Sequence, residues 1–136
     1  MSGGNIKARA LTYVFVMLLL AAATVVIGML IKDVTYRGYY LTLSLGGIVL
    51  FTSAVYAAVI KLKKDDDVRG IAASAIQALW VSTSMGLGYI VTANAPYFQI
   101  PQAYAVVLFA IGWVMLLFGF YSLLKLSKES GVPLAV

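Results

Sequence analysis

The chain of 136 residues contains no histidine and no cysteine. These residues supply most of the ligands that proteins use for haem, copper and zinc, and cysteine also supplies thiol redox pairs. Asp and Glu together number only five, and none lies inside a long apolar run. Proton relays and ion paths through membranes normally depend on ionisable groups at that depth. The composition therefore argues against a redox, metal-dependent or ion-pumping protein, and we expect no cofactor and no metal.

Long apolar runs dominate what is present, since 62% of the residues are apolar and only 11% are charged. A bilayer core about 30 Å thick needs roughly 20 apolar residues per crossing helix. Four runs meet this length without a single Lys, Arg, Asp or Glu: Ala10–Ile31, Tyr39–Ile60, Gly70–Ala93 and Ala103–Leu124. We expect an all-α membrane protein of four antiparallel transmembrane helices with short loops. Residues 1–136 then form one domain, with tails at 1–6 and 127–136.

The basic residues are distributed unevenly around these runs. Eight fall on the side that holds both tails and the second connection: Lys7, Arg9, Lys61, Lys63, Lys64, Arg69, Lys125 and Lys128. Only Lys32 and Arg37 fall on the other side. The positive-inside rule therefore predicts that both termini are cytoplasmic, in a plasma or cytoplasmic membrane.

The net charge of +5 is explained by this basic fringe. Basic residues beside transmembrane helices ordinarily meet anionic lipid headgroups, and we expect such contacts near Lys61, Lys63, Lys64 and Arg69. A nucleic-acid partner is not expected.

Three consecutive aspartates, Asp65–Asp67, precede the third run. Adjacent carboxylates converge poorly on one cation, and calcium loops usually interleave their ligands with other residues. Negative charge is favourable before a helix N-terminus, where an Asp side chain also caps free backbone N–H groups. We therefore predict that Asp67 is the N-cap of the third helix.

The opposite side of the membrane is marked by aromatic residues and prolines. Pro96 interrupts the third helix, and Pro101 suits the first turn of the fourth. Aromatic side chains near the outer ends of the runs predict an interfacial belt, made of Tyr36, Tyr39, Tyr40, Tyr89, Tyr97, Phe98 and Tyr104.

Small residues indicate where the helices pack, because helix association in lipid depends on close backbone approach. In the third run they recur at every fourth position, at Gly70, Ser74, Ala78, Ser82 and Gly86. The fourth run has Ala105, Gly112 and Gly119 at sevenfold spacing, the period of a left-handed seam. We predict a helix-packing interface at these glycines, serines and alanines and expect the third helix to be the most closely packed. The stripe fits either a compact left-handed bundle or a row of helices against another subunit.

Few polar or amphipathic residues lie deep in the runs. Gln77 predicts a polar interhelical contact, with a bound quinone or substrate as the alternative. Trp80 and Trp113 lie nearer the middle of their runs than interfacial tryptophans do. We interpret them as packing anchors, with contact to a pigment, quinone or lipid tail as the alternative.

These features favour a non-catalytic accessory or structural subunit of a larger integral membrane complex, of the respiratory or another energy-converting kind. Its expected partners are other integral membrane subunits. The alternative is a small transporter or channel for an uncharged solute, with a path lined by Gln77, Ser82 and Thr83. An enzyme is not expected, since no His, Asp or Glu lies at the depth of the Ser and Thr hydroxyls to activate them. Four spans alone name no family, because many unrelated proteins share that shape.

Overall fold

The computed structural model describes residues 3–134, and these residues are almost entirely helical. Four long helices, α1 (Gly3–Ile31), α2 (Tyr36–Leu62), α3 (Val68–Asn94) and α4 (Gln102–Ser130), are joined by short connections, and a 3-10 turn spans Pro96–Phe98. All four helices are long and apolar enough to cross a membrane. The expectation of an all-helical fold with four helices long and apolar enough to span a membrane is confirmed.

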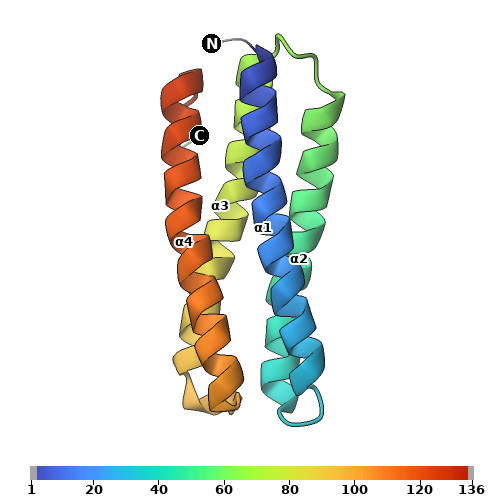
Figure 1. The fold of residues 1–136 in the computed structure, drawn as a ribbon, viewed down its shortest axis with the longest axis vertical. Coiled ribbons are helices and arrows are strands. Elements are labelled where there is room, and N and C mark those ends of the chain that lie inside the picture. The colour runs from blue at the N-terminus through green and yellow to red at the C-terminus, as the bar shows by residue number, and fades with distance from the viewer. Residues whose placement is uncertain (1–2, 135–136) are drawn as a thin grey trace.

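The four helices lie side by side in one bundle (Figure 1). α2 and α4 lie on opposite sides, and α1 and α3 lie between them, each in contact with the other three helices. In its most apolar stretch, α3 has 50% of its residues buried, against 22% in each of α2 and α4. The third helix is thus the most deeply packed, as the small-residue stripe predicts.

The helices extend beyond the apolar runs from which they were predicted. α1 begins at Gly3, well before Ala10, and α4 continues from Leu124 to Ser130. Apolar composition marks only the part of a helix that lies in hydrocarbon, whereas Lys and Arg are good helix formers and extend it into the headgroup zone.

The helix ends are closed by local hydrogen bonds. The backbone N–H of Gly70 donates to Asp67 Oδ1 at 3.1 Å, so the predicted N-cap is confirmed. Thr35 caps α2 in the same way, accepting from the Gly38 N–H at 3.2 Å. α4 ends at Gly131, which has a φ of 76° and donates its N–H to the Ser127 carbonyl. A residue with that φ is normally glycine, because other side chains clash there.

The two prolines in the connection between α3 and α4 account for where α3 ends and α4 begins. Ala95 precedes Pro96 and is extended, at φ −86° and ψ 118°, which ends α3 at Asn94. Pro101 takes the N-cap position directly before α4. The Thr35 hydroxyl donates to the Phe98 carbonyl at 2.5 Å, so the α1–α2 and α3–α4 connections meet at one end of the bundle.

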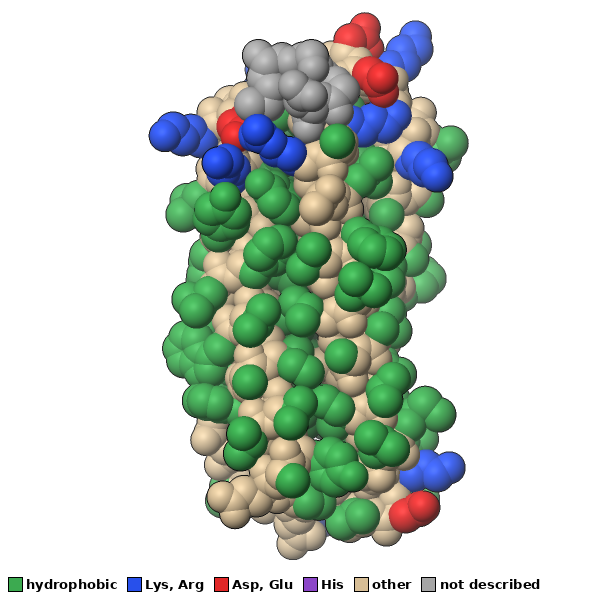
Figure 2. All heavy atoms as spheres, in the orientation of Figure 1, with side chains coloured by type: hydrophobic (Ala, Val, Ile, Leu, Met, Phe, Trp, Pro, Cys, Tyr) green, Lys and Arg blue, Asp and Glu red, His purple; other side chains and the backbone are tan. Residues whose placement is uncertain are grey.

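Charged residues are confined to the two ends, and hydrophobic side chains cover the middle of the face in Figure 2. The start of α1 lies at the same end as the α2–α3 connection, because Lys7 Nζ contacts Asp65 Oδ1 at 3.1 Å and the Lys63 carbonyl at 2.8 Å. The end of α4 lies there too, because Arg9 pairs with Glu129. We call this end the basic end, since Lys and Arg gather there in Figure 2.

The segment after α4 does not extend away from the protein as a tail. Helix α4 includes residues 127–130, Val132 is buried, and the Leu134 carbonyl accepts a hydrogen bond from Trp80 Nε1 at 3.0 Å. The apolar side chains of this segment explain the difference, because burying them against the rest of the protein removes apolar surface from water. Residues 1–2 and 135–136 of the expected tails lie outside the described residues.

Replacing the N-cap tests how far local capping stabilises the helix. We expect Asp67→Ala to lower the free energy of unfolding by about 1 kcal/mol, because the Gly70 N–H loses its acceptor. Denaturant or thermal unfolding of the purified protein in detergent measures this. Asp66→Ala is the matched control, since it removes the same charge from an exposed neighbour that caps no helix. Equal losses in both variants would show that general charge matters and the cap does not.

Candidate functional site

Helices α3 and α4 approach each other closely at a glycine crossing. A methyl group at Gly86 would lie 2.9 Å from the Gly112 carbonyl oxygen, and one at Gly112 would lie 2.7 Å from the Gly86 carbonyl oxygen. A methyl group at Gly119 would overlap the Thr83 side chain. The two backbones therefore touch at positions where no side chain larger than hydrogen fits.

The other members of the expected packing interface are not equivalent. Ala78 and Ser82 are buried like Gly86, whereas Ser74 is half-buried near the basic end. Gly70 lies at the edge, and the atoms nearest to a methyl group built on it belong to its own capping residue, Asp67. The absence of a side chain at Gly70 therefore leaves room for the capping Asp67 side chain. The small residues nearer the centre of α3 leave room for other helices.

Polar side chains inside the bundle are mostly satisfied by their own helix. The Ser82 hydroxyl donates to the Ala78 carbonyl at 3.1 Å, and the Thr83 hydroxyl donates to the Leu79 carbonyl at 2.6 Å. Because these hydrogen bonds to the backbone of the same helix satisfy the hydroxyls, Ser and Thr can lie deep in an apolar bundle without a ligand. These hydroxyls carry no sign of activation as nucleophiles, because their protons already have acceptors and no base faces them among the described residues.

A buried polar cluster joins three helices near the end opposite the basic end. Tyr89 of α3 is fully buried, and its hydroxyl lies 2.7 Å from Thr24 Oγ1 of α1 and 3.4 Å from the Thr42 carbonyl of α2. Gly46 makes room for it, since a methyl group there would lie 3.0 Å from the Tyr89 hydroxyl. These contacts hold α1, α2 and α3 together at this level of the bundle.

The assignment of Tyr89 to the interfacial belt is therefore wrong. Its phenol points into the bundle because Thr24 and Gly46 offer a hydrogen-bond partner and space. Tyr36, Tyr40 and Tyr97 are more than half exposed, as belt residues should be, and the Arg37 guanidinium lies 4.3 Å from the centre of the Tyr97 ring. Thr24 and Gly46 lie in the first and second apolar runs, but the sequence does not show that one tyrosine reaches both.

Gln77 lies on the outer surface of α3, beside α2. The Tyr56 hydroxyl donates to Gln77 Oε1 at 2.8 Å, so the side chain does make an interhelical contact. No acceptor for its two Nε2 protons is found among the described residues, and the residue is exposed. Ser82 and Thr83 are buried, so these three residues do not line a common surface.

The two tryptophans also lie at the surface of the bundle. Trp80 is 38% exposed, donates to the Leu134 carbonyl and packs edge-on against Phe120. Trp113 is 41% exposed and contacts Phe109 edge-on. Within the described part of the chain, the Trp113 indole N–H has no acceptor. Trp80 holds the C-terminal segment, while Trp113 presents a ring and a free donor to the surroundings.

At the basic end, ion pairs use the acidic residues. Asp65 pairs with Lys7, and Asp67 lies 3.9 Å from Lys63 in addition to capping α3. Glu129 receives Arg9. No group of three or more His, Cys, Asp or Glu side chains able to hold a metal occurs among the described residues.

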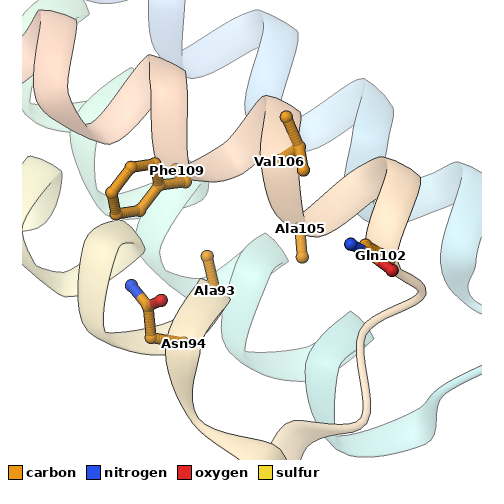
Figure 3. Close-up of a pocket in the computed structure, with 6 residues that line it drawn as sticks. All are labelled: Ala93, Asn94, Gln102, Ala105, Val106 and Phe109. Carbon is orange, nitrogen blue, oxygen red and sulfur yellow. The ribbon is translucent and has the colours of Figure 1, made fainter.

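An open groove lies at the other end, between the last turn of α3 and the first turns of α4 (Figure 3). Its volume is about 260 Å³, and it is lined by Ala93, Asn94, Gln102, Ala105, Val106 and Phe109. The Asn94 amide donates to the Ile90 carbonyl of its own helix at 2.8 Å. The lining contains no charged side chain, so the groove offers no ion-pair partner to a charged group.

Comparison of this chain with protein-family models, curated proteins and solved structures finds no match. The function must therefore be argued from the geometry above. That geometry provides close helix packing, two outward-facing polar donors and a charged rim.

The glycine crossing can be tested with two identical substitutions at different sites. We expect Gly86→Ala to destabilise the protein by about 1–3 kcal/mol, because the added methyl group must push apart two backbones. Gly47→Ala is the matched control, since a methyl group at Gly47 meets nothing within 4 Å. It should be neutral or slightly stabilising, as alanine is the better helix former. The fraction remaining monodisperse after heating in detergent measures both, and equal behaviour would contradict the crossing.

Proposed function

We propose that this chain is a non-catalytic accessory subunit of a larger integral membrane complex. The observation that carries the proposal is the exposed amide of Gln77, in the apolar part of α3. A polar group that faces lipid without a hydrogen-bond partner is unfavourable by a few kcal/mol. A neighbouring transmembrane helix that offers an acceptor removes this cost.

The surface of α4 supports the same proposal. Trp113 combines an exposed ring with an unsatisfied N–H, the pairing of an apolar body and a polar tip that is enriched at protein interfaces. Aromatic anchors of this kind commonly contribute most to the affinity of an interface. Gln77 and Trp113 lie on different helices, so we infer contacts with the complex through both α3 and α4.

A non-catalytic role fits the chemistry available at this depth. The buried Ser82 and Thr83 hydroxyls donate to carbonyls of their own helix, and the carboxylates lie at the ends of the bundle, where Asp65, Asp67 and Glu129 form ion pairs. The role inferred is therefore to hold, space or complete another membrane subunit.

We further propose that the helices cross the membrane in antiparallel order with both termini in the cytoplasm. The support is the charge distribution, with eight Lys and Arg residues toward the basic end and only Lys32 and Arg37 toward the other. The exposed tyrosines Tyr36, Tyr40 and Tyr97 would then lie in the outer interfacial zone.

The accessory role is tested by replacing the unsatisfied amide. Gln77→Leu should lower the amount of co-purifying membrane subunit about tenfold after mild-detergent extraction from native membranes, the effect of losing one interhelical hydrogen bond worth about 1–2 kcal/mol. Quantitative mass spectrometry of the purified complex measures it. Gln102→Leu, the same substitution at an exposed site at the far end, should leave the complex intact. Recovery of the unmodified chain as a lone monodisperse monomer would contradict the proposal.

The orientation is tested by thiol labelling, which the natural absence of cysteine makes clean. Asp33→Cys and Asp66→Cys place single thiols in exposed positions of the α1–α2 and α2–α3 connections. A membrane-impermeant maleimide applied to intact cells should label the cysteine at position 33 and leave that at 66 unlabelled until the cells are opened. The reverse pattern would overturn the orientation.

A further inference from the structure

A second surface groove, between α1 and α2, differs from the groove of Figure 3 in its chemistry. Its walls are mainly apolar, with Leu11, Phe15 and Val16 from α1 and Ala57 from α2, and its volume is about 360 Å³. The small side chain of Ala57 helps to leave this space open between the helices. Toward the basic end the groove reaches Lys61, in the last turn of α2.

The groove continues into a hollow at the basic end. This hollow has a volume of about 450 Å³ and shares Leu11 and Lys61 with the groove, and Lys7, Ala8 and Asp65 complete its lining. The apolar groove along the helices therefore continues directly into the charged residues that line the hollow. That sequence of environments matches the depth profile of a membrane leaflet, from acyl chains to headgroups.

The charge of the rim is positive at Lys61. The negative charge of Asp65 is already paired with Lys7, at 3.1 Å, and Lys7 also donates to the Lys63 carbonyl. Lys61 is exposed, and no carboxylate partner for its ammonium group is found among the described residues. The rim of the hollow therefore offers one uncompensated cation directly above the apolar groove.

We propose that this groove binds one anionic phospholipid, with an acyl chain along Leu11, Phe15 and Ala57 and the phosphate at Lys61. The site rests on the membrane location proposed above and does not require the accessory role. A neighbouring apolar transmembrane helix would fill the apolar part but offer no anion to Lys61. A free phosphate ion would leave the apolar part unfilled. The groove of Figure 3 lacks a cation and has no such complement.

The test uses the purified full-length chain in detergent and native mass spectrometry. Phosphatidylglycerol and phosphatidylcholine with identical acyl chains are titrated separately, and phosphatidylglycerol should bind more tightly. Lys61→Gln should weaken its binding about fivefold, the effect of one basic residue near an anionic headgroup. Lys64→Gln is the matched control, because it removes the same charge from the same connection but lies outside the groove and the hollow. It should leave binding unchanged.

A second variant tests the apolar part without altering charge. Ala57→Leu fills the groove and should weaken phosphatidylglycerol binding, provided that its melting temperature matches that of the unmodified chain; Val16→Phe serves the same purpose if Ala57→Leu is unstable. Equal binding of the two lipids, equal losses in the two lysine variants, or full competition by inorganic phosphate would each overturn the proposal. The isolated chain is used throughout, so loss of the partner in the Gln77→Leu experiment does not affect the result.

Discussion

The bundle depends on the close approach of α3 and α4 at Gly86 and Gly112. In lipid the hydrophobic effect does little to hold helices together, so the contact must come from van der Waals packing between backbones. A methyl group on Gly86 would lie 2.9 Å from the Gly112 carbonyl oxygen, and one on Gly112 would lie 2.7 Å from the Gly86 carbonyl oxygen. Once α4 is held in this way, Gly119 lies on Thr83, and the C-terminal segment folds back to reach Trp80.

Two groups of polar side chains differ in how the packing leaves them. Inside, Ser82 and Thr83 bond to their own helix, and Tyr89 bonds across to α1 and α2, so these residues stabilise the bundle. Outside, the amide N–H groups of Gln77 and the indole N–H of Trp113 face the surroundings. The inner group explains how the chain folds, and the outer group is the basis for proposing a membrane partner.

The two ends of the bundle also differ in what they can bind. The basic end combines ion pairs that join α1, α4 and the α2–α3 connection with Lys61, which has no carboxylate partner among the described residues and lies where an apolar groove begins. The other end has tyrosines, prolines and an uncharged groove. An anionic lipid is therefore proposed at the first end and no ligand at the second.

The number of long helices, their apolar character and the Asp67 cap could be predicted from the sequence, because they follow from local composition and from hydrogen bonds within a few residues. It also singled out Gly86, Gly112 and Gly119, because small size has few other uses in a lipid-embedded helix. The packing of the helices was needed to show that Tyr89 points inward, that Gln77 lies outside and that Gly70 makes room for the cap. Composition reports how deep a residue lies in the membrane, whereas the direction of its side chain depends on how each helix is rotated against its neighbours.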